Sequence, residues 1–270
     1  GEDDVRANEL MKYFKDKNVK AIFPGTGGYG ATRILSLLDF NTIKKNPKIF
    51  IGFSDITALH IAINNHANLV TFHSPNPMYG IGSKNGLEPI SELYFWSLLM
   101  NDEDSYEIPF DIYGDSLIVK ILVPGISSGV LVGGNLSLIC STMGSKYEID
   151  TENKILFIED VGESPYRVDR YLQELKWAGK LNKVKGVIIG RFSRRDSEVP
   201  DKLTDFKMEE VFGQYFSDFK VPVIYDFPSG HGAKNISIPL GVAAEINTED
   251  QIFRLLEYPL KNWLAYKINV

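Results

Sequence analysis

Cysteine is almost missing from this sequence: its 270 residues include a single one, Cys140. One cysteine cannot form a disulfide bond within the chain, which argues against the disulfide-stabilised secreted domains and favours a reducing compartment. We therefore expect a cytoplasmic protein. Cys140 itself lies in the apolar run LSLIC, where we predict a packing role.

Long apolar runs and basic clusters are lacking as well. No segment approaches the roughly 18 consecutive apolar residues of a membrane-spanning helix. The formal net charge is -6, and no run of Lys and Arg is longer than two residues. We therefore expect neither nucleic acid nor a membrane as a partner, and we expect a small molecule or peptide as the ligand.

The residues that are present follow an α/β pattern. Strand-like runs at 19–23 and 48–53 alternate with the helical patterns ATRILSLLDF and ITALHIAINN, which predicts a parallel sheet with its ligand site at the carboxyl ends of the strands. Further strands are predicted at 154–160 and 184–192, around the amphipathic helix YRVDRYLQELKWAG.

These patterns predict three regions. Residues 1–80 form an N-terminal domain, 81–128 a linker or lid with one helix near ISELYFWSLLM, and 129–270 a second α/β domain. A helical pattern begins almost at the first residue with no strand before it, so we expect the first domain to be incomplete and upstream sequence to be missing.

The glycine loop GTGGYG allows three interpretations. Gly25, Gly27 and Gly30 match a dinucleotide-binding fingerprint between a strand and a helix, and Asp55 ends the next strand, as in an NAD-binding oxidoreductase. The loop could equally be a tight strand-to-helix turn. A third function is half of an oxyanion hole built from backbone N–H groups.

Ser54 is the candidate nucleophile. It lies in GFSD at 52–55, at a sharp turn between a strand and a helix, which is where a hydroxyl is exposed over the edge of a sheet. Ile56 occupies the second glycine position of the GxSxG elbow, so that motif is not strictly matched. A helix cap is the alternative role for Ser54 or Asp55.

A nucleophilic serine needs a base, and the chain has four histidines. His231 lies between two glycines in FPSGHGAKN, where an imidazole has little packing value and a function is favoured. His60 and His66 fall on the helix after Ser54, and His73 in FHSP remains an alternative base.

The third member of a triad is a carboxylate that orients the imidazole. Glu159 ends the apolar strand KILFI, where a buried acid is costly without a partner. Asp160 and Glu163 are the competitors, each with the alternative role of an acid at a helix start.

At this point the chain resembles the LD-carboxypeptidases, a family of serine peptidases that includes the microcin C7 self-immunity proteins. The similarity extends over nearly the whole sequence. It rests on GGYG, GFSDITALH, FHSP, GVLVGGNLSL, KILFIEDVGESPYRVDRYLQEL, and FPSGHG followed by PLG.

The resemblance implies an N-terminal Rossmann-like domain that carries the serine, a C-terminal domain that carries the acid and the histidine, and an active site between them. The family's catalytic residues fall on Ser54, Glu159 and His231, and its oxyanion hole on Gly27 or Gly28 with the Asp55 amide. No cofactor and no metal are implied.

The implied reaction removes a terminal D-amino acid, typically D-alanine, from a muramoyl tetrapeptide in cytoplasmic peptidoglycan recycling, and a homodimer is implied as well. The microcin branch instead cleaves an aspartyl-nucleotide linkage. Two positions depart from the family: Thr26 stands where arginine is common, and Ser145 replaces a frequent threonine.

Overall fold

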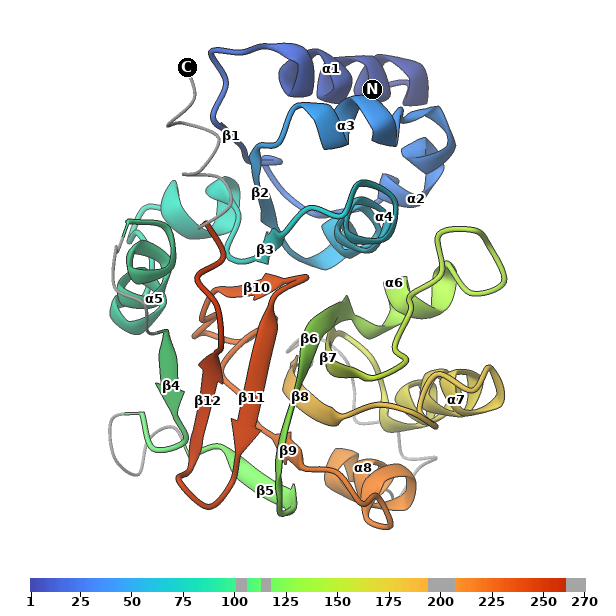
Figure 1. Ribbon diagram of the computed structural model, residues 1–270, viewed down its shortest axis with the longest axis vertical. Helices are drawn as coiled ribbons and strands as arrows, with labels where there is room; N and C mark the ends of the chain where they lie inside the picture. Colours follow the sequence, from blue (N-terminus) through green and yellow to red (C-terminus); the bar gives the residue numbers. More distant parts are fainter. Residues whose placement is uncertain (101–105, 113–117, 194–206, 261–270) are drawn as a thin grey trace.

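The computed structural model describes residues 1–100, 106–112, 118–193 and 207–260. Two sheets form its framework: one of four strands in the order β1-β2-β3-β10 and one of eight in the order β4-β12-β11-β6-β7-β8-β9-β5 (Figure 1). The predicted α/β class is therefore confirmed. Among the described residues, no helix combines the length and the apolar character needed to cross a membrane.

The first part of the chain builds three strands of the smaller sheet, and β1, β2 and β3 run parallel. Its elements are α1 (Asp3–Lys15), β1 (Ala21–Ile22), α2 (Ala31–Ile34), the 3-10 helix η1 (Leu35–Leu37), α3 (Phe40–Lys45), β2 (Ile49–Gly52), the 3-10 helix η2 (Ser54–Ile56), α4 (Thr57–Ala67) and β3 (Thr71–His73).

The helical pattern predicted over 31–40 is divided in the structure. The chain turns after η1, and Asp39 then starts α3 because its carboxylate accepts hydrogen bonds from the backbone N–H groups of Asn41 and Thr42. An aspartate at the N-cap satisfies donors that a continuous helix would have bonded to earlier carbonyls.

The middle of the chain is less irregular than its composition suggests. The predicted helix is α5 (Pro89–Met100), and it follows the π-helix η3 (Pro77–Ile81). Two strands of the same region, β4 (Glu107–Pro109) and β5 (Lys120–Val123), lie at opposite edges of the eight-stranded sheet. Both are short, and sequence periodicity does not reveal a three- or four-residue strand.

The last part of the chain supplies the rest of the larger sheet. Strands β6, β7, β8 and β9 are parallel, and α6, α7 and α8 cover one face of the sheet (Figure 1). The elements are β6 (Ile126–Asn135), α6 (Leu136–Ser141), β7 (Lys154–Val161), α7 (Pro165–Trp177), β8 (Gly186–Ser193), α8 (Met208–Phe216), β9 (Val223–Tyr225), β10 (Ile238–Leu240), β11 (Ala243–Asn247) and β12 (Ile252–Leu255).

Two features join the sheets. β10 crosses back from the last part of the chain and pairs antiparallel with β3. One apolar core contains buried residues of both sheets, such as Phe72, Phe157 and Ile238. Each buried side chain of this size stabilises the fold by roughly 1.5–3 kcal/mol, so the sheets form a rigid support for groups at their junction. The boundaries at residues 80 and 128 remain predictions.

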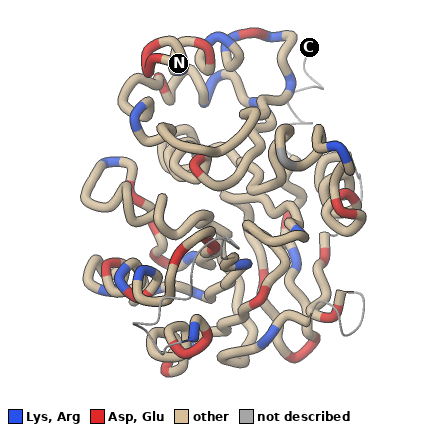
Figure 2. The backbone as a smooth tube through the Cα atoms, turned by 180° about the vertical axis from the view of Figure 1, so that it is seen from behind, with Lys and Arg blue, Asp and Glu red and all other residues tan. Residues whose placement is uncertain are grey.

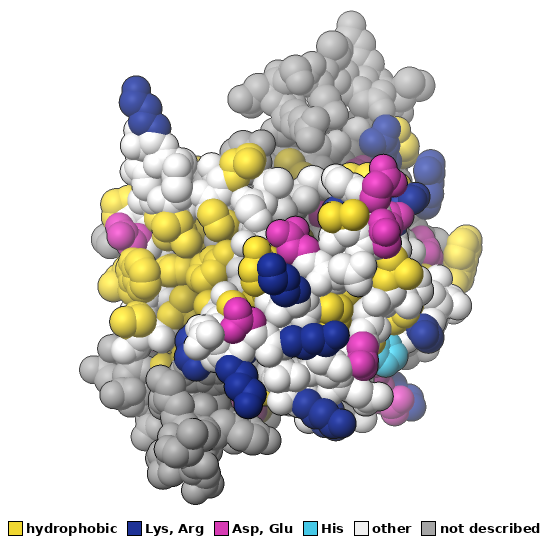
Figure 3. Space-filling model, turned by 90° about the horizontal axis from the view of Figure 1, so that it is seen from above, with side chains coloured by type: hydrophobic (Ala, Val, Ile, Leu, Met, Phe, Trp, Pro, Cys, Tyr) yellow, Lys and Arg dark blue, Asp and Glu magenta, His cyan; other side chains and the backbone are white. Residues whose placement is uncertain are grey.

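Among the described residues, Lys and Arg are interspersed with Asp and Glu over the backbone (Figure 2). On the face seen in Figure 3, hydrophobic side chains gather toward one side, and charges of both signs occupy the rest.

Candidate active site

The Ser54 turn joins β2 to α4 through the short helix η2. Ser54 has a φ of 64°, which places a non-glycine residue in the left-handed region. That conformation costs free energy and recurs where a function requires it. The sharp turn predicted from GFSD is therefore present, and Ser54 lies at the carboxyl end of β2.

The glycine loop lies directly against this turn at Gly27. A Cβ atom added to Gly27 would come within 2.7 Å of the Ser54 Cβ, 3.1 Å of its hydroxyl oxygen and 3.2 Å of the Asp55 backbone nitrogen. The backbone can approach so closely only because this residue has no side chain. Gly27, Ser54 and the Asp55 amide are thus brought together, as an oxyanion site beside a nucleophile requires.

The Asp55 carboxylate turns back to the end of the glycine loop. It accepts a hydrogen bond of 2.7 Å from the backbone N–H of Ala31, and burial raises the pKa of this carboxyl. In an NAD site this acid would instead be free for a ribose hydroxyl. The carboxylate fixes the loop to the serine turn, so Asp55 has a structural role.

His231 and Glu159 form the second half of the site. The His231 Nδ1 atom lies 2.6 Å from the Glu159 Oε2 atom, and the backbone N–H of His231 donates to the same oxygen at 3.1 Å. Glu159 is fully buried at the end of β7, and the His231 side chain is 15% exposed. A buried carboxylate in this position fixes the imidazole tautomer and orientation and leaves Nε2 for chemistry.

Gly230 permits this close contact. Its φ of 111° is disfavoured for residues with side chains, and a Cβ here would come within 2.7 Å of the Glu159 carboxylate. The first glycine of GHG is therefore explained by backbone conformation and space.

The competing acids point elsewhere. Asp160 accepts hydrogen bonds of 2.8 Å from the Asn135 side chain and from the Ser137 backbone N–H, at the start of α6. Successive residues of a strand face opposite sides, so Glu159 and Asp160 cannot both meet His231. Glu163 forms an ion pair of 3.6 Å with Arg167.

Two contacts connect the halves. Phe53, which precedes Ser54, packs its ring against His231 with 4.8 Å between ring centroids. At the start of α4, the Thr57 hydroxyl accepts a 2.9 Å hydrogen bond from the Asn135 backbone N–H, at the end of β6. Asn135 is paired with Glu159 across the larger sheet. The structure therefore forms two groups, Gly27 with the Ser54–Asp55 turn and Glu159 with His231, and the Phe53 ring next to Ser54 touches the second group.

The other three histidines lack a carboxylate partner among the described residues. His60 is buried and its Nε2 atom bonds to the Gly52 carbonyl at 2.8 Å, and His66 bonds to the Lys146 carbonyl at 3.0 Å. His73 is fully buried beside Phe157, and burial lowers its pKa well below the usual value. Such a residue stays neutral and enclosed, which disfavours His73 as the base.

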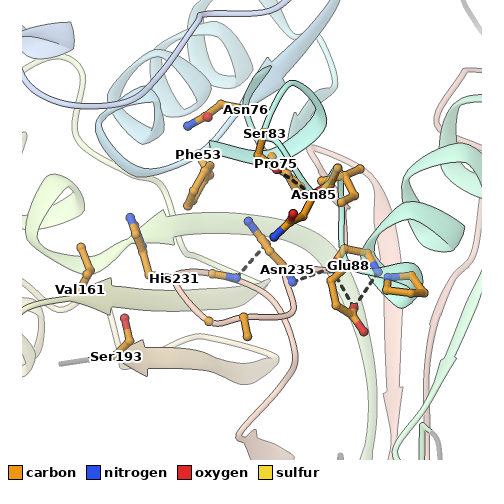
Figure 4. Close-up of a pocket in the computed structure, with 18 residues that line it drawn as sticks. Phe53, Pro75, Asn76, Ser83, Asn85, Glu88, Val161, Ser193, His231 and Asn235 are labelled. Atoms are coloured by element: carbon orange, nitrogen blue, oxygen red, sulfur yellow. Dashed lines mark hydrogen bonds between the residues drawn. The ribbon is translucent and has the colours of Figure 1, made fainter. Parts of the chain in front are cut away.

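A pocket of about 660 Å³ opens beside His231 (Figure 4). The described residues that line it include one carboxylate, Glu88, and no Lys or Arg. Neutral polar side chains dominate its polar lining, namely Asn76, Ser83, Asn85, Ser91, Ser193 and Asn235. Amide and hydroxyl groups of this kind suit the donors and acceptors of a peptide backbone. Within the described part of the chain, no cluster of His, Cys, Asp and Glu could hold a metal ion.

The fold and this site have known counterparts. The family model for the LD-carboxypeptidase N-terminal domain matches residues 1–74, and the model for the C-terminal domain matches residues 128–246. The Bacillus subtilis protein named "Probable murein peptide carboxypeptidase" is 39% identical over 251 residues, which cover 93% of this chain and 76% of that protein. The chain therefore belongs to the LD-carboxypeptidase family of serine peptidases.

Another relative and two solved structures extend this finding. The "Murein tetrapeptide carboxypeptidase" of Pseudomonas aeruginosa is 30% identical over 90% of this chain and 78% of its own. The muramoyltetrapeptide carboxypeptidase of Oxalobacter formigenes superposes with a TM-score of 0.82 at 27% identity, covering 94% of this chain and 83% of that one. The microcin C7 self immunity protein MccF, in complex with aspartyl sulfamoyl adenosine, has a TM-score of 0.83 at 25% identity, covering 95% and 82%.

Sequence reasoning did not single out Phe53 or Asn235, although both line the pocket. Phe53 is part of the GFSD motif and directly precedes Ser54, so its position was a usable signal. Asn235 carries no such signal, since an asparagine in a loop is most often a turn residue.

Proposed function

We propose that this protein is a serine carboxypeptidase in which Ser54 is the nucleophile, His231 the base and Glu159 the acid that orients His231. The observation that carries the proposal is the 2.6 Å contact between His231 Nδ1 and the buried Glu159, with the His231 ring packed on the residue next to Ser54.

In the first step, His231 accepts the Ser54 hydroxyl proton on Nε2, and the serine oxygen attacks the carbonyl carbon of the scissile amide. The backbone N–H of Asp55, together with that of Gly27 or Gly28, stabilises the negative charge that develops on the carbonyl oxygen. Collapse of the tetrahedral intermediate breaks the C–N bond, and His231 gives its proton to the departing amine.

In the second step, His231 removes a proton from a water molecule, which attacks the acyl-Ser54 ester. The acid product leaves and the serine hydroxyl is restored. Glu159 stabilises the imidazolium in both steps without taking its proton.

The substrate that we propose is a muropeptide tetrapeptide, from which the enzyme releases a terminal D-amino acid such as D-alanine. Relatives named for murein peptides support this choice, as does a pocket lined by neutral polar groups. We further propose a role in peptidoglycan recycling in the cytoplasm, as a homodimer.

A second candidate is hydrolysis of a peptidyl or aspartyl nucleotide, as in microcin immunity. Its support is the likeness to MccF in complex with aspartyl sulfamoyl adenosine, at a TM-score of 0.83. The carboxypeptidase is favoured because the relative named for murein peptides reaches 39% identity, against 25% for that structure.

The test is mass-spectrometric product analysis with two substrates side by side. One is a tetrapeptide ending in L-Lys-D-Ala or meso-diaminopimelyl-D-Ala, and the other is aspartyl sulfamoyl adenosine. We expect D-alanine release that is lost in S54A. Cleavage of the nucleotide alone would assign the protein to the immunity branch, and undiminished turnover by S54A would exclude the proposed nucleophile.

A further inference from the structure

The loop that carries His231 is closed at its base by hydrogen bonds. The Ile236 backbone N–H donates to the Pro228 carbonyl at 2.7 Å, and the Ser229 hydroxyl donates to the Ile236 carbonyl at 2.8 Å. Between these ends lie Gly230 and Gly232, on either side of His231. Glycines add backbone freedom, so the position of the imidazole depends on the contacts that hold the loop.

Asn235 holds the residue before His231. Its side-chain oxygen accepts a hydrogen bond of 2.9 Å from the Gly230 backbone N–H, and Asn235 is only 7% exposed. The next N–H along the chain, that of His231, is bound by Glu159 at 3.1 Å. Two successive backbone groups are thus fixed by two buried side chains from different parts of the chain.

Asn235 is also attached to the wall of the pocket. Its backbone N–H donates to the Ser91 hydroxyl at 2.9 Å, in the first turn of α5. Glu88 accepts from the backbone N–H groups of Ile90 and Ser91 at 3.1 Å and 3.3 Å, and so fixes the start of that helix. Hydrogen bonds therefore run from the pocket wall, through Asn235, to the histidine loop.

We propose that Asn235 is a positioning residue for His231: its side-chain oxygen holds Gly230 so that the imidazole stays aligned with Ser54, and its backbone links this alignment to α5. The inference rests on the proposed function, because it takes His231 as the base. In this role Asn235 acts through His231, so its loss should lower the rate of the chemical step more than it weakens binding.

The test compares N235L with N235D. Leucine has nearly the shape of asparagine but no acceptor, whereas aspartate keeps an oxygen in the same place. The readout is labelling of Ser54 by a fluorophosphonate, followed by intact-protein mass spectrometry, with the maximal rate and the half-saturating concentration measured separately. The control N247A removes a comparable loop anchor far from the site, where the Asn247 side-chain oxygen binds the N–H groups of Glu249 and Asp250 at 3.0 Å.

For N235L we expect the maximal labelling rate to fall on the order of 10²-fold, as a misaligned catalytic group does, with little change in half-saturation. N235D should have a maximal labelling rate about tenfold higher than that of N235L, because aspartate restores the acceptor. It should stay below the wild-type rate because it also buries a charge. N247A should label at the wild-type rate. Wild-type labelling of N235L, or no advantage of N235D over N235L, would overturn the proposal.

Two further results keep the inference separate from the proposed function. No labelling of the wild-type protein at Ser54, or labelling that persists in S54A, would count against the function itself. If N235L does not fold, S91A is measured in its place, because it removes only the hydroxyl that accepts the hydrogen bond of the Asn235 backbone N–H. A several-fold lower maximal rate supports the proposal, and a wild-type rate in S91A contradicts it.

Discussion

The two halves of the site are held in place by different means. Around Ser54 the geometry comes from the backbone: a left-handed serine, a glycine loop packed against it, and an amide brought alongside. Around His231 the geometry comes from buried side chains, since Glu159 and Asn235 bind consecutive backbone N–H groups.

This difference follows from the catalytic role that we propose for each half. An oxyanion site needs N–H groups that leave room for substrate, and close backbone approach provides them. A base needs a fixed ring orientation and a stabilised cation, which a buried carboxylate provides. Added side-chain volume near Ser54 should therefore lower kcat, and so should loss of a hydrogen-bond acceptor near His231.

The largest effect is expected for E159Q, which keeps the shape of the side chain and removes its charge. We predict a loss of roughly 10⁴-fold in kcat with a smaller change in KM, because the imidazolium loses its stabilising partner. Steady-state D-alanine release by purified enzyme measures it. Activity within tenfold of wild type would show that Glu159 is a packing residue.

Added volume in the serine half should have the next largest effect. In G27A the new methyl group would lie 2.7 Å from the Ser54 Cβ and 3.2 Å from the Asp55 amide nitrogen, so one of them must shift. We predict a fall in kcat of roughly 10²-fold, as for loss of one oxyanion donor. G25A is the matched control, because nothing lies within 4 Å of its added Cβ, and it should keep kcat. Equal losses in both variants would disprove the role of close approach.

Beneath the serine turn, His60 makes stability depend on pH. Burial lowers the pKa of His60 from 6.5 to about 4. The stability that the neutral, buried imidazole contributes is therefore fully present above pH 6.5 and is lost as the pH falls toward 4. In that window the free energy of unfolding should fall by up to about 1.4 kcal/mol per pH unit through this residue. H60Q can still donate to the Gly52 carbonyl and does not titrate. Its free energy of unfolding, measured by urea denaturation at several pH values, should therefore change less between pH 4 and pH 6 than that of the wild type. An equal pH dependence in H60Q and wild type would show that His60 does not cause it.

The smallest effect is expected outside both halves, at Cys140. Its sulfur is buried 3.6 Å from the Tyr171 carbonyl, and burial raises the pKa of the thiol. C140A should cost about 1 kcal/mol of stability and leave kcat unchanged. The native thiol should react with Ellman's reagent only after unfolding, and rapid reaction in the native protein would refute its burial.

Much of the site could be predicted from the sequence because its motifs are local. A serine between a strand and a helix, a glutamate ending an apolar strand and a histidine between glycines each carry their own signal. The sequence alone left Asp160 and Glu163 open as alternatives to Glu159. The contact with His231 separates them, and that contact depends on which face of β7 each residue occupies.

The unpredicted features depend on residues far apart in the chain. The pairing of β10 with β3 joins residues more than 160 positions apart, and no periodicity signals it. The Asn235 contacts likewise involve Ser91 on a helix of the middle region. Such contacts exist only once the sheets have packed together, which is why they are absent from any local pattern.

Mapping the site at which a fluorophosphonate attaches tests whether Ser54 is the nucleophile. Wild-type protein is labelled, digested and analysed by tandem mass spectrometry, beside S54A and H231A. We expect one adduct, on Ser54, that is absent from S54A and forms far more slowly in H231A. An adduct on another serine, or labelling of H231A at the wild-type rate, would contradict it.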